Sequence, residues 1–116
     1  MSDIHTLIDA ILEFRRERGW EGYNNPKDIA MYLSVEAGEL LEHFLWRDSE
    51  ELQKYIETHR EDIADEIGDI MYCLLFLGHT LGIDVVDAQK RKLEKTKKKY
   101  PADKVNGRVV KWTELV

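Results

Sequence analysis

Two pairs of carboxylates lie inside the two most apolar helical stretches of this sequence, and they limit how those stretches can pack. Glu36 and Glu39 form the first pair, and Glu66 and Asp69 form the second. A spacing of three residues places both side chains of a pair on nearly the same face of a helix. Each pair borders an apolar stripe, where desolvation and mutual repulsion of carboxylates are costly. We therefore expect a hard cation such as Mg²⁺, which prefers oxygen ligands, between the two helices.

Apolar residues recur every three or four positions along most of the chain, which is the pattern of helices packed through one face. A chain of 116 residues fits one domain. We expect this domain to have its core over about residues 4–101 and a C-terminal tail over 102–116, where a short strand is possible. The predicted fold is an all-α helix bundle of four to five helices. The predicted helices cover residues 4–18, 26–45, 49–59, 61–81 and 84–99.

Particular residues mark the ends of these helices. Asp3 is a candidate N-cap for the first helix, and Asn25 followed by Pro26 has the pattern of an N-cap with proline at the first helical position. Gly19 and Gly82 are placed to end the first and fourth helices. The element boundaries therefore rest on capping chemistry as well as on periodicity.

Charge and cysteine content argue against several classes of protein. The formal net charge is −6, so no affinity for nucleic acid is expected. The single cysteine, Cys73, cannot form an intramolecular disulfide and lies in an apolar run typical of a buried side chain. The N-terminal residues carry no targeting signal, and the longest apolar run is shorter than the roughly 20 residues that cross a membrane. We expect a cytoplasmic protein with no membrane partner.

The residue types in the acidic motifs narrow the choice of cation. Two antiparallel helices would bring the four carboxylates around one or two ions, as in other helix-bundle metal sites. Neither motif contains histidine, which argues against zinc and di-iron chemistry, and all-oxygen ligation favours Mg²⁺ or Mn²⁺. The alternative is that these acids are solvated on exposed helix faces, since the chain has 23 acidic residues.

Several segments together resemble the MazG-like nucleoside triphosphate pyrophosphohydrolases. Residues 35–46, Val-Glu-Ala-Gly-Glu-Leu-Leu-Glu-His-Phe-Leu-Trp, are similar to the first signature of that family, and residues 65–70, Asp-Glu-Ile-Gly-Asp-Ile, look like the second. The basic helix that ends in Tyr100-Pro101 also resembles the family. Residues 14–20, Phe-Arg-Arg-Glu-Arg-Gly-Trp, resemble its small, dCTP-pyrophosphatase-like branch. The likeness covers about residues 4–101.

This resemblance implies a magnesium-dependent enzyme, with Mn²⁺ as a possible substitute, that cleaves a nucleoside triphosphate into a monophosphate and pyrophosphate. It makes Glu36, Glu39, Glu66 and Asp69 the catalytic metal ligands, with either Glu36 or Glu39 orienting the attacking water. It also implies a homodimer or a dimer of dimers, with each active site near a subunit interface. The implied role is house-cleaning of the nucleotide pool, with dCTP or a modified pyrimidine nucleotide as the leading substrate.

The same resemblance suggests residues that bind the substrate. Trp20 and Trp46 match aromatic positions that contact the base in the dCTP-pyrophosphatase-like branch. Independently of the resemblance, the side chain of Asn24 or Asn25 could read a base edge. Lys92 matches a family lysine that could contact phosphate. Thr96 stands where relatives often have asparagine, so a polar substrate contact there is in question.

Two alternatives remain open from the sequence. Within the superfamily, the activity could be that of a phosphoribosyl-ATP pyrophosphohydrolase or a dUTPase-like enzyme. From another class, the chain could be a non-catalytic helical interaction module in which the acids bind a cation passively or serve dimer electrostatics.

Overall fold

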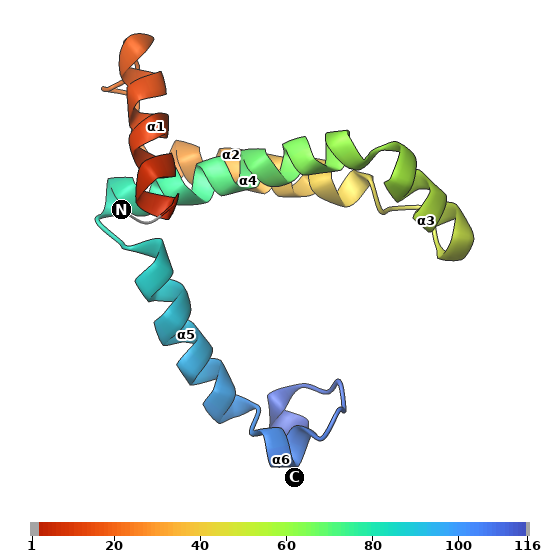
Figure 1. Cartoon of the computed structure of the whole chain (residues 1–116). Helices are drawn as coiled ribbons and strands as arrows, with labels where there is room; N and C mark the ends of the chain where they lie inside the picture. Colours follow the sequence, from red (N-terminus) through yellow and green to blue (C-terminus); the bar gives the residue numbers. More distant parts are fainter. Residues whose placement is uncertain (1–2, 116) are drawn as a thin grey trace. The chain divides into compact units, whose positions relative to one another are not determined.

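The computed structural model describes residues 3–115, and these residues are all-helical, as predicted (Figure 1). No strand occurs among them, and the possible strand of the tail is instead a 3₁₀ turn. No single described helix is long and apolar enough to cross a membrane, although α4 (Arg60–Leu81) and α5 (Val85–Lys99) taken together pass that test by length and composition alone. The helices are α1 (Asp3–Glu17), α2 (Pro26–Glu42), α3 (Ser49–Thr58), α4 (Arg60–Leu81), α5 (Val85–Lys99), α6 (Ala102–Val105) and the 3₁₀ helix η1 (Trp112–Glu114).

The chain divides into two compact units, Met1–Ile83 and Asp84–Val116. The boundary lies between α4 and α5. The single domain expected from the sequence, with a core over about residues 4–101 and a tail over 102–116, stays a prediction. The two units are described in turn.

In the first unit, α2 and α4 lie side by side and run in opposite directions, while α1 and α3 contact α4 near its two ends (Figure 1). The small core forms where α1 meets this pair. It is centred on Ile29 of α2 with Cys73 and Phe76 of α4, so the expected burial of Cys73 is confirmed. Partly buried apolar side chains surround this cluster: Ile11, Leu12, Leu33, Tyr72 and Leu77.

Local chemistry explains where most of these helices begin and end. The Asn25 side chain accepts a hydrogen bond from the Lys27 backbone N–H at 2.9 Å, which caps α2 as predicted. Gly19 and Gly82 have positive φ angles of 71° and 68°, the conformation that glycine adopts most easily at a helix end. Asp3 lies within the first turn of α1 rather than at its N-cap.

The end of α2 differs from the prediction, because the helix stops at Glu42 and not near Leu45. Trp46 takes a positive φ of 68°, which breaks the helical path. The Arg47 guanidinium donates to the carbonyl oxygens of Glu42, His43 and Leu45, so a side chain satisfies the open end of the helix.

Stacked side chains attach helix α3 to the turn that follows α2. Tyr55 donates or accepts a 2.7 Å hydrogen bond with His43 Nδ1, stacks on the His59 ring at 3.9 Å, and receives the Arg47 guanidinium on its ring at 3.7 Å. These contacts connect the end of α2 with the start of α4.

In the second unit, the tail folds back on the end of α5. Asp84 caps α5 through its side chain, as expected for a helix starting at this point. The Trp112 backbone N–H donates to the Tyr100 hydroxyl at 3.3 Å, and the Lys99 ammonium lies 5.2 Å from the centre of the Trp112 ring.

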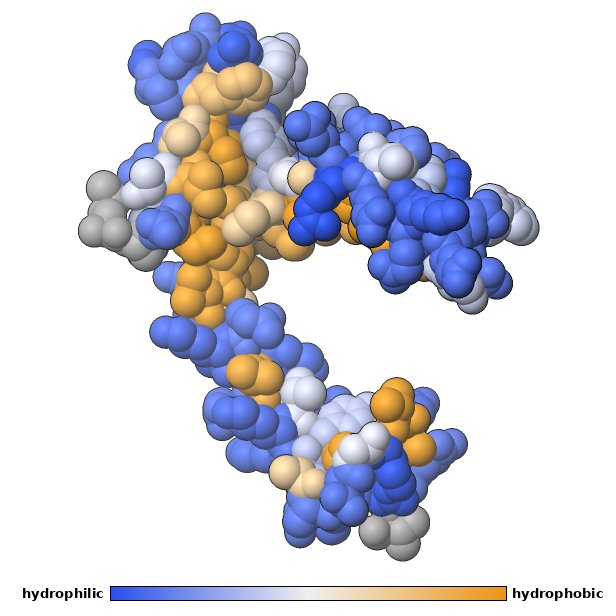
Figure 2. Space-filling view, turned by 45° about the vertical axis from the view of Figure 1, so that its right-hand side comes forward, coloured by the Kyte–Doolittle hydropathy of each residue, from blue (hydrophilic) through white to orange (hydrophobic). Residues whose placement is uncertain are grey.

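The first unit buries few apolar side chains and exposes many. Ile29, Ile63, Cys73, Leu75 and Phe76 are its buried apolar residues, all on α2 and α4. Figure 2 shows apolar side chains gathered on the surface of this unit, whereas the region of α3 is largely hydrophilic. Exposed apolar residues on α2 and α4 include Met31, Val35, Leu41, Ile67, Met71 and Leu74.

Candidate active site

The antiparallel pairing of α2 and α4 brings three of the four predicted carboxylates together. One side-chain oxygen each from Glu36, Glu39 and Glu66 lies within 4.8 Å of the others. Two of these residues come from α2 and one from α4, so their proximity requires the helix pairing. Carboxylate oxygens at such separations can share one divalent cation.

The two partly buried members of this cluster have oxygens that the protein does not satisfy. The Oε2 atoms of Glu36 and Glu66 are buried and have no hydrogen-bond partner among the described residues. A buried polar atom without a partner costs free energy, and a cation that accepts these oxygens as ligands removes that cost.

Burial and neighbouring charges act together on these two carboxyl groups. Desolvation raises the pKa of Glu36 to about 7, with further contributions from the charges of Glu39 and Asp69. Desolvation also raises the pKa of Glu66, aided by the charge of Glu39. The cluster therefore resists full ionisation unless positive charge enters it.

Asp69 lies outside the tight group of three but close enough to act on it by charge. Its carboxylate contributes to the raised pKa values of Glu36, Glu66 and Cys73, although burial is the largest cause in each case. The side chain is exposed on α4, one turn beyond Glu66. A fourth oxygen ligand is thus available beside the three.

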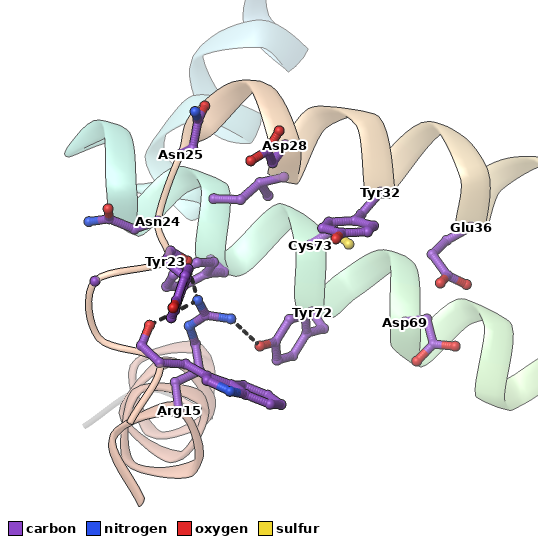
Figure 3. A pocket seen from close by; sticks show the side chains of 14 residues that line it. Arg15, Tyr23, Asn24, Asn25, Asp28, Tyr32, Glu36, Asp69, Tyr72 and Cys73 are labelled. Carbon is purple, nitrogen blue, oxygen red and sulfur yellow. Dashed lines mark hydrogen bonds between the residues drawn. The ribbon is translucent and has the colours of Figure 1, made fainter. Parts of the chain in front are cut away.

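A pocket of about 870 Å³ extends from the acids toward the loop at residues 19–25. Figure 3 shows Glu36 and Asp69 at one end of it, and Arg15 with the loop residues at the other. Its wall combines carboxylates with several aromatic rings. The lining residues outside the acid end include Trp20, Tyr23, Asn24, Tyr32, Tyr72 and Phe76.

The structure brings two of the predicted substrate residues to this pocket, and a third, Trp46, lies outside it. Trp20 and Asn24 line it, and the Trp20 ring meets Phe14 edge-on with centroids 5.7 Å apart. Trp46 is not among the lining residues, and its side chain is 94% exposed in the turn after α2. Within one chain, therefore, Trp20 and Trp46 do not form two sides of the same pocket.

Lys92 and Thr96 belong to α5 in the second unit. The Thr96 hydroxyl donates to the Lys92 carbonyl oxygen at 3.0 Å, a bond within the helix. That contact occupies the hydroxyl hydrogen of Thr96. The roles of both residues stay predictions.

Sequence reasoning missed Arg15, Tyr32 and Tyr72 in the pocket wall. Helical spacing could have indicated both tyrosines, since Tyr32 precedes Glu36 by four residues and Tyr72 follows Asp69 by three. Arg15 extends the stripe of Leu12 by three residues, but its position on that stripe does not reveal which residues it contacts.

Comparison with known proteins gives consistent matches. The sequence matches the MazG-like family over residues 31–115. It is 31% identical to dCTP pyrophosphatase 1 of Bos taurus and 30% identical to that of Homo sapiens, over 105 residues and 89% of this chain in both cases. The chain spans 62% of the length of these relatives.

A solved structure is also similar to this chain. The crystal structure of a pyrophosphatase from Archaeoglobus fulgidus has a TM-score of 0.81 and 38% sequence identity. The match covers 87% of this chain and 94% of the archaeal chain. The predicted fold class is therefore supported by a solved protein as well as by the helices themselves.

Proposed function

Because the chain belongs to the MazG-like family, we propose that it is a Mg²⁺-dependent nucleoside triphosphate pyrophosphohydrolase, with Mn²⁺ as a possible substitute. The observation that carries this proposal is the cluster of Glu36, Glu39 and Glu66 within 4.8 Å, beside a pocket of about 870 Å³ with aromatic walls. The names of the bovine and human relatives and of the archaeal structure support the same class of reaction.

The residues of the acid cluster fit a hard divalent cation. All the donors are carboxylate oxygens, and two buried oxygens lack any other partner among the described residues. We assign Glu36, Glu39, Glu66 and Asp69 as the ligands. When bound, Mg²⁺ would offset phosphate charge and lower the pKa of a coordinated water.

The side chains of the site would then divide the work of hydrolysis. Glu36 or Glu39 would orient the attacking water and accept its proton. Water oxygen would form the new bond to phosphorus, the anhydride bond between the α and β phosphates would break, and pyrophosphate would leave with the bonding electrons. The carboxylates would serve mainly to place positive charge beside the phosphates, because phosphoryl transfer depends chiefly on positioning and charge stabilisation.

The aromatic end of the pocket suits a nucleobase. Trp20 supplies a large stacking face, and Asn24 offers both a donor and an acceptor to a base edge. We propose dCTP or a modified pyrimidine deoxynucleotide as the preferred substrate, in a role of clearing unwanted nucleotides from the pool. The names of the mammalian relatives favour dCTP over a phosphoribosyl-ATP or dUTPase-like activity.

We further propose that the protein works as a homodimer or homotetramer. The exposed apolar side chains of α2 and α4 and the 94% exposed Trp46 are unfavourable in water unless another surface covers them. A second copy would also allow Trp46 to approach a pocket that it does not line within its own chain. Light scattering that gives the mass of a monomer at micromolar concentration would contradict this part of the proposal.

Pyrophosphate release from a panel of nucleotides, with and without Mg²⁺, tests the activity. The panel includes dCTP, its 5-modified forms, dUTP, the other triphosphates and phosphoribosyl-ATP. Glu39→Gln should abolish release, whereas Glu42→Gln, the same change at an exposed position on the same helix, should preserve it. Absence of metal-dependent release from every nucleotide would leave the non-catalytic, cation-binding module as the better explanation.

A further inference from the structure

Arg15 is a half-buried cation in the pocket wall, and it forms no ion pair with a carboxylate of residues 3–115. The ion pairs of residues 3–115 involve other side chains, such as Arg16 with Glu13. The Arg15 guanidinium instead lies over the Phe76 ring, with its central carbon 3.9 Å from the ring centroid, and 6.0 Å from the centre of the Trp20 ring. The positive charge of Arg15 is therefore stabilised by aromatic faces and neutral oxygens.

The hydrogen bonds of Arg15 connect three separate segments. Nη1 donates to the Tyr72 hydroxyl on α4 at 3.0 Å. Nη2 donates to the Trp20 carbonyl oxygen at 3.3 Å and also to that of Tyr23 (Figure 3). Arg15 on α1 thus joins the loop to α4 through a single planar group.

The backbone adds to this connection. The Trp20 N–H donates to the Arg15 carbonyl at 2.9 Å, and the Tyr23 N–H donates to the Trp20 carbonyl at 3.0 Å. Trp20 and Tyr23 are the first and last residues of the turn at 20–23, and the carbonyl oxygens of both accept hydrogen bonds from the Arg15 guanidinium. Without that side chain, this exposed turn would keep only its local backbone bonds.

The bond to Tyr72 also fixes what Tyr72 can offer to a ligand. Arginine has no acceptor, so the Tyr72 oxygen must be the acceptor in this contact. The hydroxyl hydrogen then stays available for donation. Tyr72 lines the pocket between Arg15 and Asp69, so a ligand group beside it is best matched by an acceptor oxygen (Figure 3).

We propose that Arg15 is a positioning residue that fastens the turn at 20–23 to α4 and leaves the Tyr72 hydroxyl as a donor to a carbonyl oxygen of the nucleobase. This inference rests on the proposed function for its ligand, but the fastening of the turn does not depend on activity. Cytosine, uracil and guanine carry such a carbonyl and adenine does not. Arg15 and Tyr72 together should therefore favour carbonyl-bearing bases.

Steady-state kinetics of Arg15→Met test the positioning role. We expect KM for dCTP to rise about tenfold while kcat changes by less than about twofold, since the lost contacts position the turn and Tyr72 at the base end of the pocket, away from the reacting phosphates. Arg16→Met is the matched control, because Arg16 is exposed and, among residues 3–115, its ion pair is with Glu13 on the same helix. A fall in kcat with unchanged KM would overturn the proposal.

The base carbonyl is tested by comparing dCTP with dATP. Tyr72→Phe should weaken dCTP binding without weakening dATP binding by more than about twofold, measured as KM or as an inhibition constant. Arg15→Met should weaken the binding of both nucleotides, because it also loosens the turn that carries Trp20. Equal losses for both nucleotides in Tyr72→Phe would overturn the assignment of Tyr72 as a donor to a base carbonyl.

Hydrogen exchange in the nucleotide-free protein separates the two levels of the argument. Amides at residues 19–25 should exchange faster in Arg15→Met and to an intermediate degree in Arg15→Lys. Arg15→Lys keeps the positive charge and replaces Arg15→Met as the test variant if that one does not fold. Unchanged exchange in both variants would overturn the fastening role. If exchange is faster in the variants but the unsubstituted protein hydrolyses no nucleotide, the proposed function is refuted while the fastening role of Arg15 still holds.

Discussion

The two ends of the pocket are built in different ways. At the acid end, Glu36, Glu39, Glu66 and Asp69 lie on two regular helices, and the helix repeat together with one pairing places them. At the loop end, irregular backbone is held by the contacts of one side chain, Arg15. The acid end is therefore fixed by periodicity, and the loop end by specific contacts. We expect substitutions at the acid end to act on kcat and those at the loop end to act on KM.

The largest effect is expected from Asp69→Asn. Asp69 lies outside the tight group of three, so its loss tests whether the acid end works as a set of four. Loss of a ligand charge at a metal that stabilises phosphoryl transfer should lower kcat by roughly 10³-fold. Turnover within a few-fold of the unsubstituted protein, with circular dichroism confirming the fold, would remove Asp69 from the site.

A smaller effect is expected from Trp20→Ala at the loop end. Loss of a stacking surface should raise KM by about tenfold, because a base stacked on an aromatic ring contributes about 1–3 kcal/mol. The value of kcat should change little. The comparison of the two ends fails if kcat falls as steeply in this variant as in Asp69→Asn.

The stability of the metal-free protein should depend on pH through the acid end. The pKa of Glu36 is raised from an ordinary value of 4.5 to about 7, so the folded protein holds a proton that the unfolded chain has lost between these values. Stability then falls as pH rises from about 4.5 to about 7 and levels off above that.

Thermal melting without metal should therefore give a higher Tm at pH 5.5 than at pH 7.5. Glu36→Gln should reduce this difference, while other titrating groups remain in both proteins. Mg²⁺ should raise Tm more at pH 7.5, because protons compete with the cation for the same oxygens. An identical pH profile in the variant would contradict the assignment of this dependence to Glu36.

The smallest effect is expected from Asn25→Ala, at the junction of the loop with α2. Loss of the cap to the Lys27 N–H should cost about 1 kcal/mol of unfolding free energy, measured with urea. Both kcat and the metal dependence should persist, since α2 keeps its pairing with α4. A large loss of kcat would show that the two ends are not independent.

The same contrast explains how much the sequence could predict. The positions of Glu36 and Glu66 follow from apolar stripes that can be counted along the chain, and the caps at Asn25 and Gly82 follow from local backbone chemistry. These features depend on a few neighbouring residues. The all-α fold and the pairing of the acidic helices were therefore predictable.

The contacts of Arg15 and the end of α2 could not be predicted in that way. Arg15 meets Tyr72 across 57 positions of sequence, and no local pattern encodes such a contact. The end of α2 is accompanied by the positive φ at Trp46 and by Arg47 donating to three carbonyl oxygens, whereas the helical pattern alone extends to Leu45. Tertiary contacts decide both features.

The exposure of Trp46 in the turn after α2 has a practical consequence for studying this protein in solution. Its indole is 94% exposed, compared with 42% for Trp20 and 44% for Trp112. An indole in water emits at longer wavelength than one in an apolar environment, so Trp46 is a fluorophore already placed at a bare surface. In a variant with Trp20 and Trp112 replaced by phenylalanine, a shift of the remaining emission on dilution reports when the surface around Trp46 becomes covered, without any attached dye.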